Sequence, residues 1–415
     1  MNVRIEPRQL SGIVTPPPSK SLAHRLLLAA ALAAGTSTIR NLAFSEDIEA
    51  TLRCMAQFRC QWRWQSEDTL QVQGCINQEH DRRGLLRFDC GESGSTLRFL
   101  IPIALALGGG GVFTGRGRLM ERPQEPYFQI FDRMGITHTL ERESQGAGEK
   151  VLTIQGNLQP GEYRLPGNVS SQFFTGLLMA LPLLDGLSVV VSTTKLESAP
   201  YISMTMGVLE QCGISVRYSP ALNSFGVCPG IYCPFDAAVE ADWSQAAFWY
   251  AAIALGSGLR LRGLNAHSAQ GDAAVLSLHQ KLSRSGDVAI DLTDCPDLLP
   301  PLAVMAAVRE GSTRFTGAAR LRLKESDRLT TVRDLLLDLG GFADEGPDSL
   351  TVHGVSRLTG GTVDGANDHR IVMAAAIAAT RCERPVVILG AEAVKKSYPS
   401  FWEHYEHLGG DVRVL

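Results

Sequence analysis

The chain of 415 residues is longer than one ordinary hydrophobic core supports, so we expect two domains. Apolar residues make up 45% of the chain and charged residues 20%, which is typical of a folded globular protein and excludes a disordered one. The net charge of −4 disfavours a general nucleic-acid binder, so an anionic ligand would have to be held by local clusters of cations.

Signals for export, membrane insertion or metal binding are weak. The nine cysteines are scattered without a CxxC pair, which is typical of reduced cytoplasmic thiols. Residues 1–7 lack the apolar core of a signal peptide, and polar, Gly or Pro residues interrupt every long apolar run. Cys228 and Cys233 have no second ligand pair. We therefore expect a cytoplasmic protein with no metal, no membrane partner and no nucleic-acid partner.

The first expected strand, residues 3–11, ends just before a proline run that fixes the start of a helix rich in Ala and Leu. Lys20, Ser21 and Arg25 then fall in the first turns of this helix, where free N–H groups and the helix dipole favour an anion. One interpretation is a phosphate or carboxylate site. The other is a serine N-cap with solvated basic side chains.

Two patterns recur along the chain. A helix of small apolar residues ends at glycine and a short β-branched strand follows, as at Gly35, Gly186 and Gly311. An amphipathic helix also ends at glycine and leads into an alternating strand, as at Gly135 and Gly213. Together the patterns predict an α/β fold with about six copies of a β/α unit, each roughly 70 residues long.

Six units divide naturally into two domains of three. The acidic, proline-containing stretch 233–236 is the expected crossing point. One domain would contain residues 1–14 and 235–415, with both termini, and the other residues 15–234. The hinge crossings would lie near residues 12–18 and 230–238, with a cleft between the halves.

Further helix starts in the first half carry polar groups. Residues 89–98 open an apolar helix with small residues, including Gly94, that let a ligand approach the backbone. Arginines follow in the loop 115–123, most of which we expect to be solvated. Hydroxyl and amide groups recur at the next helix starts, where N-capping also explains each serine: Ser170, Ser171, Gln172, Ser198 and Tyr201.

Acid–base groups stand among cations in the second half. Asp297 is expected in the first turn of a strongly apolar helix, as a cap or as an acceptor of a hydroxyl proton. The stretch 321–328 is dense in charge, which Asp327 as a helix cap explains in part. The candidate cations are Lys20, Arg25, Arg118, Lys324, Arg328, Arg370 and Lys396, and the candidate acid–base groups are Asp297, Glu325 and His369.

Six motifs, in this order over essentially the whole chain, resemble the 5-enolpyruvylshikimate-3-phosphate synthase family. They are Lys20-Ser21 with His24-Arg25, and residues 90–98, 120–123, 170–172, 324–328 and 367–370. The resemblance implies two similar domains, each of three βαβαββ repeats forming an inside-out α/β barrel, with the active site in the interdomain cleft. It also implies a monomer that needs no cofactor.

The reaction that the resemblance implies belongs to the shikimate pathway of aromatic amino acid biosynthesis. The enolpyruvyl group of phosphoenolpyruvate is transferred to the 5-hydroxyl of shikimate 3-phosphate, with release of phosphate, through a tetrahedral intermediate. By resemblance, the ligands of shikimate 3-phosphate would be Lys20, Ser21, Arg25, Ser170, Ser171, Gln172, Ser198, Tyr201, Asp297 and Lys324. Those of phosphoenolpyruvate would be Lys20, Gly94, Arg118, Gln172, Arg328, Arg370 and Lys396.

The chemistry needs a proton delivered to the methylene carbon and another removed from the 5-hydroxyl. We expect Glu325 with Lys20 to serve the carbon, and Asp297 to serve the hydroxyl. His369 and Lys396 would assist the departing phosphate.

Some positions depart from the family pattern. His24 stands where Asn is common, Glu92 stands where a small polar residue is frequent, and Arg320 stands where some members have Asn. The related transferase acting on UDP-N-acetylglucosamine is one alternative, but it usually has a reactive cysteine in the loop that corresponds to residues 115–123, and none is present here. A non-catalytic protein that binds phosphorylated metabolites is the other alternative.

Overall fold

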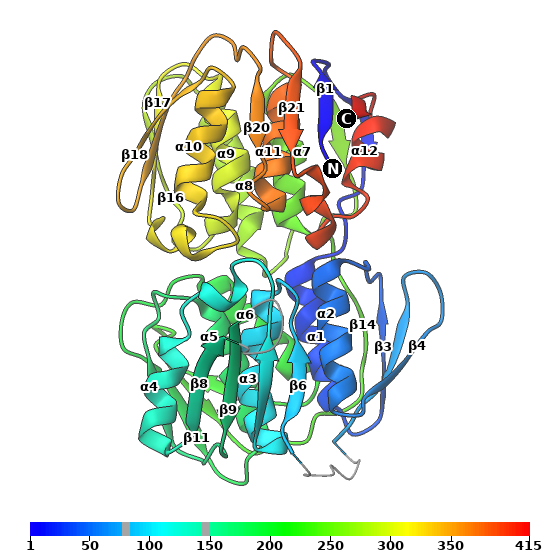
Figure 1. Cartoon of the computed structure of the whole chain (residues 1–415), viewed down its shortest axis with the longest axis vertical. Helices are drawn as coiled ribbons and strands as arrows, with labels where there is room; N and C mark the ends of the chain where they lie inside the picture. Colours follow the sequence, from blue (N-terminus) through cyan, green and yellow to red (C-terminus); the bar gives the residue numbers. More distant parts are fainter. Residues whose placement is uncertain (77–83, 143–149) are drawn as a thin grey trace. The chain divides into compact units, whose positions relative to one another are not determined.

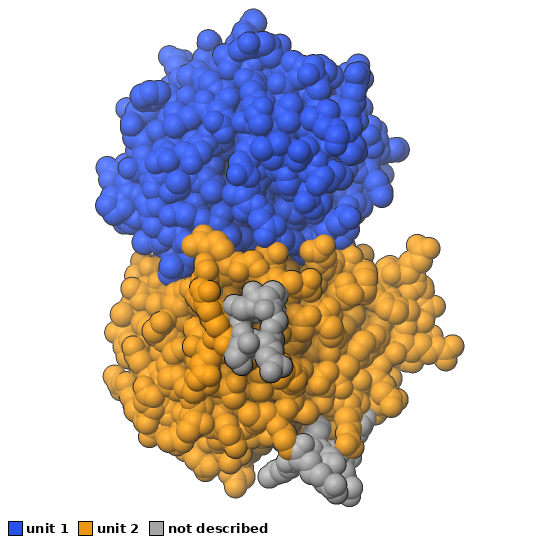
Figure 2. All heavy atoms as spheres, viewed as in Figure 1, with its two compact units in different colours: residues 1–19, 240–415 blue, residues 20–239 orange. Residues whose placement is uncertain are grey.

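The computed structural model describes residues 1–76, 84–142 and 150–415. The chain forms two compact units (Figure 2): unit 1 contains Met1–Ser19 and Glu240–Leu415, and unit 2 contains Lys20–Val239. The expected domain boundaries, after residues 14 and 234, lie somewhat earlier in the chain than these divisions.

In its described residues, unit 2 contains three four-stranded sheets with one common plan. Across each sheet, the first two strands pair in parallel, the third pairs antiparallel with the second, and the fourth pairs antiparallel with the third. In two of these sheets, a helix follows the first strand and another helix follows the second. The first repeat is β6 (Leu86–Asp89), α3 (Gly94–Gly108), β7 (Gly110–Thr114), α4 (Glu125–Met134), β8 (Thr137–Arg142) and β9 (Lys150–Gln155). The second is β10 (Glu162–Leu165), α5 (Ser171–Ala180), β11 (Ser188–Ser192), α6 (Ala199–Gln211), β12 (Val216–Tyr218) and β13 (Ser224–Val227).

The third repeat of unit 2 joins distant parts of the chain. Its elements are α1 (Lys20–Leu32), β3 (Thr36–Arg40), α2 (Glu46–Gln57), β4 (Gln61–Trp64) and β5 (Leu70–Gln73), completed by β14 (Asp236–Ala238). Strand β14 pairs in parallel with β3, with Asp236 opposite Thr38. Strand β14, at the end of unit 2, therefore completes the sheet that β3, β4 and β5 form near the beginning of the unit.

Unit 1 repeats the plan twice in full. One repeat is β16 (Val288–Asp291), α9 (Leu299–Ala307), β17 (Ser312–Thr316), α10 (Arg328–Asp338), β18 (Phe342–Glu345) and β19 (Leu350–His353). The other is β20 (Thr362–Asp364), α11 (His369–Ala379), β21 (Val386–Leu389), α12 (Phe401–His407) and β22 (Asp411–Val414), completed by β1 (Val3–Glu6). Strand β1 lies between β21 and β22, with Val3 opposite Ile388 and Val414.

The remaining elements of unit 1 form a reduced repeat. Strand β2 (Ser11–Val14) pairs in parallel with β15 (Gly258–Leu261), and in the described residues this sheet has two strands. Helix α7 (Trp243–Ala254) packs against β15, and α8 (Val275–Leu282) packs against α7. The expected single strand over residues 3–11 is thus two strands in different sheets, because Pro7 interrupts the ladder. Short 3₁₀ helices span Leu119–Glu121, Leu181–Leu183, Gly271–Ala274, Pro296–Leu298, Ala319–Leu323 and Ala391–Lys396.

Helices α3, α9 and α11 lie in the interior of their units, whereas α4 and α12 lie at the outside (Figure 1). Helices α3, α9 and α11 are apolar on all sides and almost wholly buried, as expected of helices enclosed by other elements. Helix α4 is amphipathic, with a buried face formed by Tyr127, Ile130 and Phe131. Because the enclosed helices leave no face for solvent, their polar residues are confined to the ends. Those ends carry the candidate functional groups.

Candidate active site

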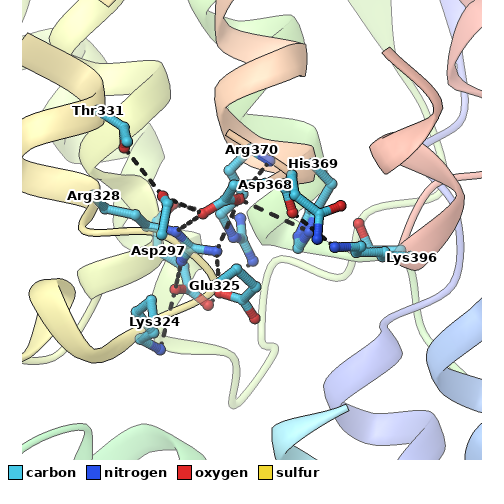
Figure 3. Close-up of polar contacts among 12 residues, drawn as sticks. Asp297, Lys324, Glu325, Arg328, Thr331, Asp368, His369, Arg370 and Lys396 are labelled. Carbon is cyan, nitrogen blue, oxygen red and sulfur yellow. Dashed lines mark hydrogen bonds and ion pairs between the residues drawn. The ribbon is translucent and has the colours of Figure 1, made fainter. Parts of the chain in front are cut away.

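Arg328 is the hub of the charged cluster in unit 1 (Figure 3). It is the first residue of α10, and the preceding residue, Asp327, is the N-cap, whose carboxylate accepts from the Thr330 N–H. The Arg328 side chain is only 1% exposed, yet it contacts three carboxylates. Its Nε lies 2.8 Å from Asp368 Oδ2, Nη1 lies 2.7 Å from Asp297 Oδ1, and Nη2 lies 2.6 Å from Glu325 Oε2.

Asp368, the N-cap of α11, holds the Arg328 side chain in place by an ion pair. It is completely buried at the N-cap of α11, where it accepts from the Arg370 N–H at 3.0 Å. It also accepts from the Ser326 hydroxyl at 2.9 Å. Burial alone would raise the pKa of Asp368, but the charge of Arg328 outweighs it and lowers that pKa. Asp368 is therefore an ionised counter-charge that sets the orientation of Arg328.

Asp297 lies between three cations. It belongs to the 3₁₀ turn Pro296–Leu298 that precedes α9, not to the first turn of that helix as expected, because the prolines at the start of α9 favour a tighter turn before it. Its carboxylate is 2.7 Å from Arg328, 3.1 Å from Arg370 and 3.4 Å from Lys324. Burial would raise the pKa of Asp297, but the charges of these cations hold it well below the usual value.

The other predicted groups of unit 1 border the same cluster. Lys396, at the end of a 3₁₀ helix, donates from Nζ to the Asn367 carbonyl at 2.7 Å. The His369 ring is 2% exposed, with Nδ1 at 3.9 Å from Asp368 Oδ1. The cluster thus combines four cations with three carboxylates: Lys324, Arg328, Arg370 and Lys396 against Asp297, Glu325 and Asp368 (Figure 3).

In unit 2, Arg25 is a buried cation surrounded by neutral groups. It follows the start of α1 at Lys20, as expected, and is 1% exposed. Four of its N–H groups donate within the protein, to Thr205 Oγ1, Thr175 Oγ1 and the carbonyls of Ser21 and Tyr201. Burial lowers the pKa of Arg25 to about 10. A buried guanidinium with no carboxylate beside it in the described part of the chain suits an anionic ligand, which would supply the missing charge.

The starts of α3 and α5 are tied together by Gln172. Its amide Nε2 donates to Ser95 Oγ at 3.0 Å, and its Oε1 accepts from Arg98 Nη1 at 2.9 Å. Ser170 caps α5 by accepting from the Gln172 N–H. Arg98 was not among the predicted site residues, although it lies within the 90–98 motif. It packs over the Phe173 ring at 4.6 Å and orients Gln172.

Gly94 lies against an arginine, but not the predicted one. A Cβ at Gly94 would stand 2.5 Å from Nη1 of Arg122 and 3.5 Å from Oε1 of Gln172. Arg122 is 8% exposed, whereas the side chain of Arg118 is exposed to solvent. The geometry therefore favours Arg122 over Arg118 as the cation beside the start of α3. Spacing within the loop could not distinguish them, because the two arginines flank the same 3₁₀ turn, Leu119–Glu121.

The start of α6 is strained. Ser198, its N-cap, has φ 56° and ψ 39°, a left-handed conformation that costs free energy for a residue with a side chain. Its side chain makes no capping hydrogen bond, and Tyr201 follows in the first turn. Strained backbone of this kind is concentrated at functional sites, so its position at a predicted site residue is notable.

Lys20 is paired within unit 2. Its Nζ lies 2.6 Å from Oδ2 of Asp47, at the start of α2. Asp47 was not predicted as a site residue. A signal was present in the sequence, since Asp47 follows Ser45 at an N-cap, but the sequence could not show that α2 starts beside α1.

Comparison with known proteins identifies the family. The model of EPSP synthase (3-phosphoshikimate 1-carboxyvinyltransferase) matches residues 5–405. The chain belongs to this family. Proteins named 3-phosphoshikimate 1-carboxyvinyltransferase from Clostridium kluyveri and Clostridium acetobutylicum are each 42% identical, over 99% of this chain and 98% of theirs.

Solved structures share the fold. An EPSP synthase from Acinetobacter baumannii matches with a TM-score of 0.79 and 24% identity, over 100% of both chains. The enolpyruvyl transferase NikO from Streptomyces tendae matches with a TM-score of 0.77 and 17% identity, over 99% of this chain and 98% of its own. The expected α/β fold is confirmed.

The described residues contain no group of three or more His, Cys, Asp or Glu side chains placed to hold a metal ion. In residues 1–76, 84–142 and 150–415, no helix is both long enough and apolar enough to cross a membrane.

Proposed function

We propose that this protein transfers the enolpyruvyl group of phosphoenolpyruvate to the 5-hydroxyl of shikimate 3-phosphate, with residues from both units. Family membership supports the reaction. The observation that carries the assignment of residues is the position of Asp297, a buried carboxylate between Arg328, Arg370 and Lys324. Such a site matches a reaction between two anionic substrates that requires a base.

In unit 2, shikimate 3-phosphate binds at the starts of α1, α5 and α6. Arg25 supplies a buried positive charge, and one of its five N–H groups remains beyond the four that donate to described residues. Hydroxyl groups at the helix starts complete the site, because helix N-termini favour phosphate oxygens. The ligands assigned to this substrate in unit 2 are Lys20, Ser21, Arg25, Ser170, Ser171, Gln172, Ser198 and Tyr201.

Phosphoenolpyruvate binds between cations. We assign Lys20, Gly94, Gln172 and Arg122 of unit 2 to it, with Arg122 in place of Arg118 because Arg122 lies against Gly94. Arg328, Arg370 and Lys396 of unit 1 complete the set, since the planar fork of arginine binds carboxylate and phosphate through two hydrogen bonds.

The incoming anions also activate the base. Without substrate, the low pKa of Asp297 makes its carboxylate a weak proton acceptor. The bound substrate anions take hydrogen bonds from the three cations that pair with Asp297: Arg328, Arg370 and Lys324. Because these cations then stabilise the Asp297 carboxylate less, the pKa of Asp297 rises. Asp297 then takes the proton of the 5-hydroxyl as that oxygen attacks the enolpyruvyl carbon.

The remaining groups serve the other proton and the leaving group. Glu325 and Lys20 act on the methylene carbon, which gains a proton in the addition and loses one in the elimination. His369 and Lys396 stabilise the departing phosphate. Both are almost wholly buried, so their interaction with phosphate is weakly screened by water.

Release of inorganic phosphate tests this function. The purified protein is incubated with phosphoenolpyruvate and either shikimate 3-phosphate or UDP-N-acetylglucosamine. We expect phosphate release with the first acceptor only, and its loss in an Asp297→Ala variant that still melts cooperatively. Release with the second acceptor would establish the alternative transferase, and binding of shikimate 3-phosphate without turnover would establish a non-catalytic binding protein.

A further inference from the structure

Two adjacent residues of α1 enter two separate buried networks. His24 is 0% exposed, and its Nδ1 lies 2.8 Å from Thr51 Oγ1 on α2. Thr51 Oγ1 lies 2.7 Å from Thr96 Oγ1 on α3, which in turn donates to Ser93 Oγ at 2.7 Å. We call His24, Thr51, Thr96 and Ser93 the α1–α3 relay. It joins the starts of three helices through side chains alone.

Proton counting gives the relay a direction. Each hydroxyl donates one hydrogen, and Thr96 uses its own toward Ser93. Thr51 Oγ1 has two acceptors within reach, Thr96 Oγ1 at 2.7 Å and the Asp47 carbonyl at 3.3 Å, and the shorter contact assigns its hydrogen to Thr96. Thr51 then accepts from an N–H on His24 Nδ1, which leaves His24 Nε2 as the unprotonated nitrogen. His24 Nε2 is indeed buried without a hydrogen-bond partner among the described residues. The relay therefore requires neutral His24 with its proton on Nδ1, and the hydrogen bonds run from His24 through Thr51 and Thr96 to Ser93.

The second network joins Arg25 of α1 to α5 and α6. Arg25 Nε donates to Thr205 Oγ1 on α6 at 2.8 Å, and Nη2 donates to Thr175 Oγ1 on α5 at 3.3 Å. The two threonine hydroxyls are 2.8 Å apart, and both residues are 0% exposed. We call Arg25, Thr175 and Thr205 the α5–α6 network. Among the residues that the structure describes, no hydrogen bond joins this network to the α1–α3 relay.

The two networks end at different groups. The relay ends at Ser93, whose hydroxyl caps α3 one residue before Gly94. Its middle residue Thr51 lies one helical turn after Asp47, the partner of Lys20 at 2.6 Å. The α5–α6 network instead holds the Arg25 guanidinium and reaches the first turn of α6 at Tyr201.

We propose that the α1–α3 relay positions the phosphoenolpyruvate ligands and the α5–α6 network positions the shikimate 3-phosphate ligands, so that α1 sets the two substrate sites independently. This inference rests on the proposed function, in which Lys20 and Gly94 bind the first substrate and Arg25 the second. His24, Thr51, Thr96, Thr175 and Thr205 are positioning residues, since each acts through a neighbour.

Two matched substitutions test the proposal. Thr51→Val and Thr205→Val each replace one fully buried hydroxyl with a methyl group of nearly the same shape. We expect Thr51→Val to raise the KM for phosphoenolpyruvate at least fivefold while the KM for shikimate 3-phosphate stays within twofold. Thr205→Val should show the reverse, and Thr51→Ser, which restores the hydroxyl, should return the KM for phosphoenolpyruvate to within twofold of the unchanged protein.

Additional variants and measurements keep the outcomes separate. If Thr51→Val does not fold, Thr96→Val interrupts the same relay and should give the same selective change. Equal effects on both KM values, or a change in melting temperature with neither KM altered, would overturn the proposal. Failure of the proposed function would give a different result: the wild-type protein would release no phosphate with shikimate 3-phosphate.

Discussion

At the scale of single residues, the site depends on which arginine stands beside Gly94. Arg122 is buried against that glycine, whereas Arg118 is exposed. We expect Arg122→Ala to weaken phosphoenolpyruvate binding by about 1.5–3 kcal/mol, the usual value of a hydrogen bond to a charged group, or roughly 10- to 150-fold in KM. Arg118→Ala is the matched control and should stay within about twofold. Steady-state kinetics decides between them, and the opposite ranking would restore Arg118.

Gly94 itself leaves space for that arginine. The methyl group of a Gly94→Ala variant would stand 2.5 Å from Arg122 Nη1, so the guanidinium must move. We expect a KM for phosphoenolpyruvate raised about tenfold, equivalent to about 1.4 kcal/mol, and weaker inhibition by anionic analogues such as glyphosate. Inhibition titrations measure both effects. An unchanged inhibition constant for glyphosate would contradict this account.

At the scale of elements, Asp368 connects the start of α11 to α10. An Asp368→Ala variant loses a helix cap and leaves the buried Arg328 without one of its counter-charges. We expect a decrease of about 3–5 kcal/mol in the free energy of unfolding, the usual cost of breaking a buried ion pair. Asp368→Asn, which keeps an oxygen able to cap α11, should cost less.

Denaturant unfolding measures these costs. Asp411→Asn is the control, because Asp411 pairs with the largely exposed Arg413 at 3.4 Å and such pairs contribute little. It should change the free energy of unfolding by less than about 0.5 kcal/mol. If Asp368→Ala lowered the free energy of unfolding no more than Asp411→Asn, Asp368 would not be the counter-charge of Arg328 that we describe.

At the scale of the whole molecule, stability depends on pH through His24. Burial, followed by the charges of Lys20 and Arg25, lowers the pKa of His24 well below its usual value. Below a pH of about 6.5 the unfolded chain binds a proton at this residue and the folded protein does not. The contribution of His24 to stability is therefore present above that pH and is lost as the pH falls.

Comparison with His24→Asn isolates this effect from the other histidines. Between about pH 6.5 and 5, the unchanged protein should lose about 1.4 kcal/mol per pH unit more than the variant. Urea unfolding at a series of pH values provides the measurement. Parallel pH dependences of the two proteins would show that His24 titrates alike in the folded and unfolded states.

Sequence reasoning predicted much of the architecture, because its determinants are local. Glycines at helix ends, β-branched strands and prolines before helices depend on neighbouring residues, and they indicated both the α/β repeats and the start of α1 at Lys20. The reduced repeat around β2 and β15 was not predicted, since a missing strand pair leaves no positive signal. The position of Asp297 before α9 differed from expectation by one turn.

What the sequence alone determined was the repeat, the helix starts and the types of chemical group that they carry. The tertiary structure decided the partners: Arg122 beside Gly94, Asp47 with Lys20, and Asp368 behind Arg328. The physical reason is that a helix start depends on a few successive residues, whereas an ion pair depends on where two distant helices end. Only the packing of those helices brings the second group within hydrogen-bond distance of the first.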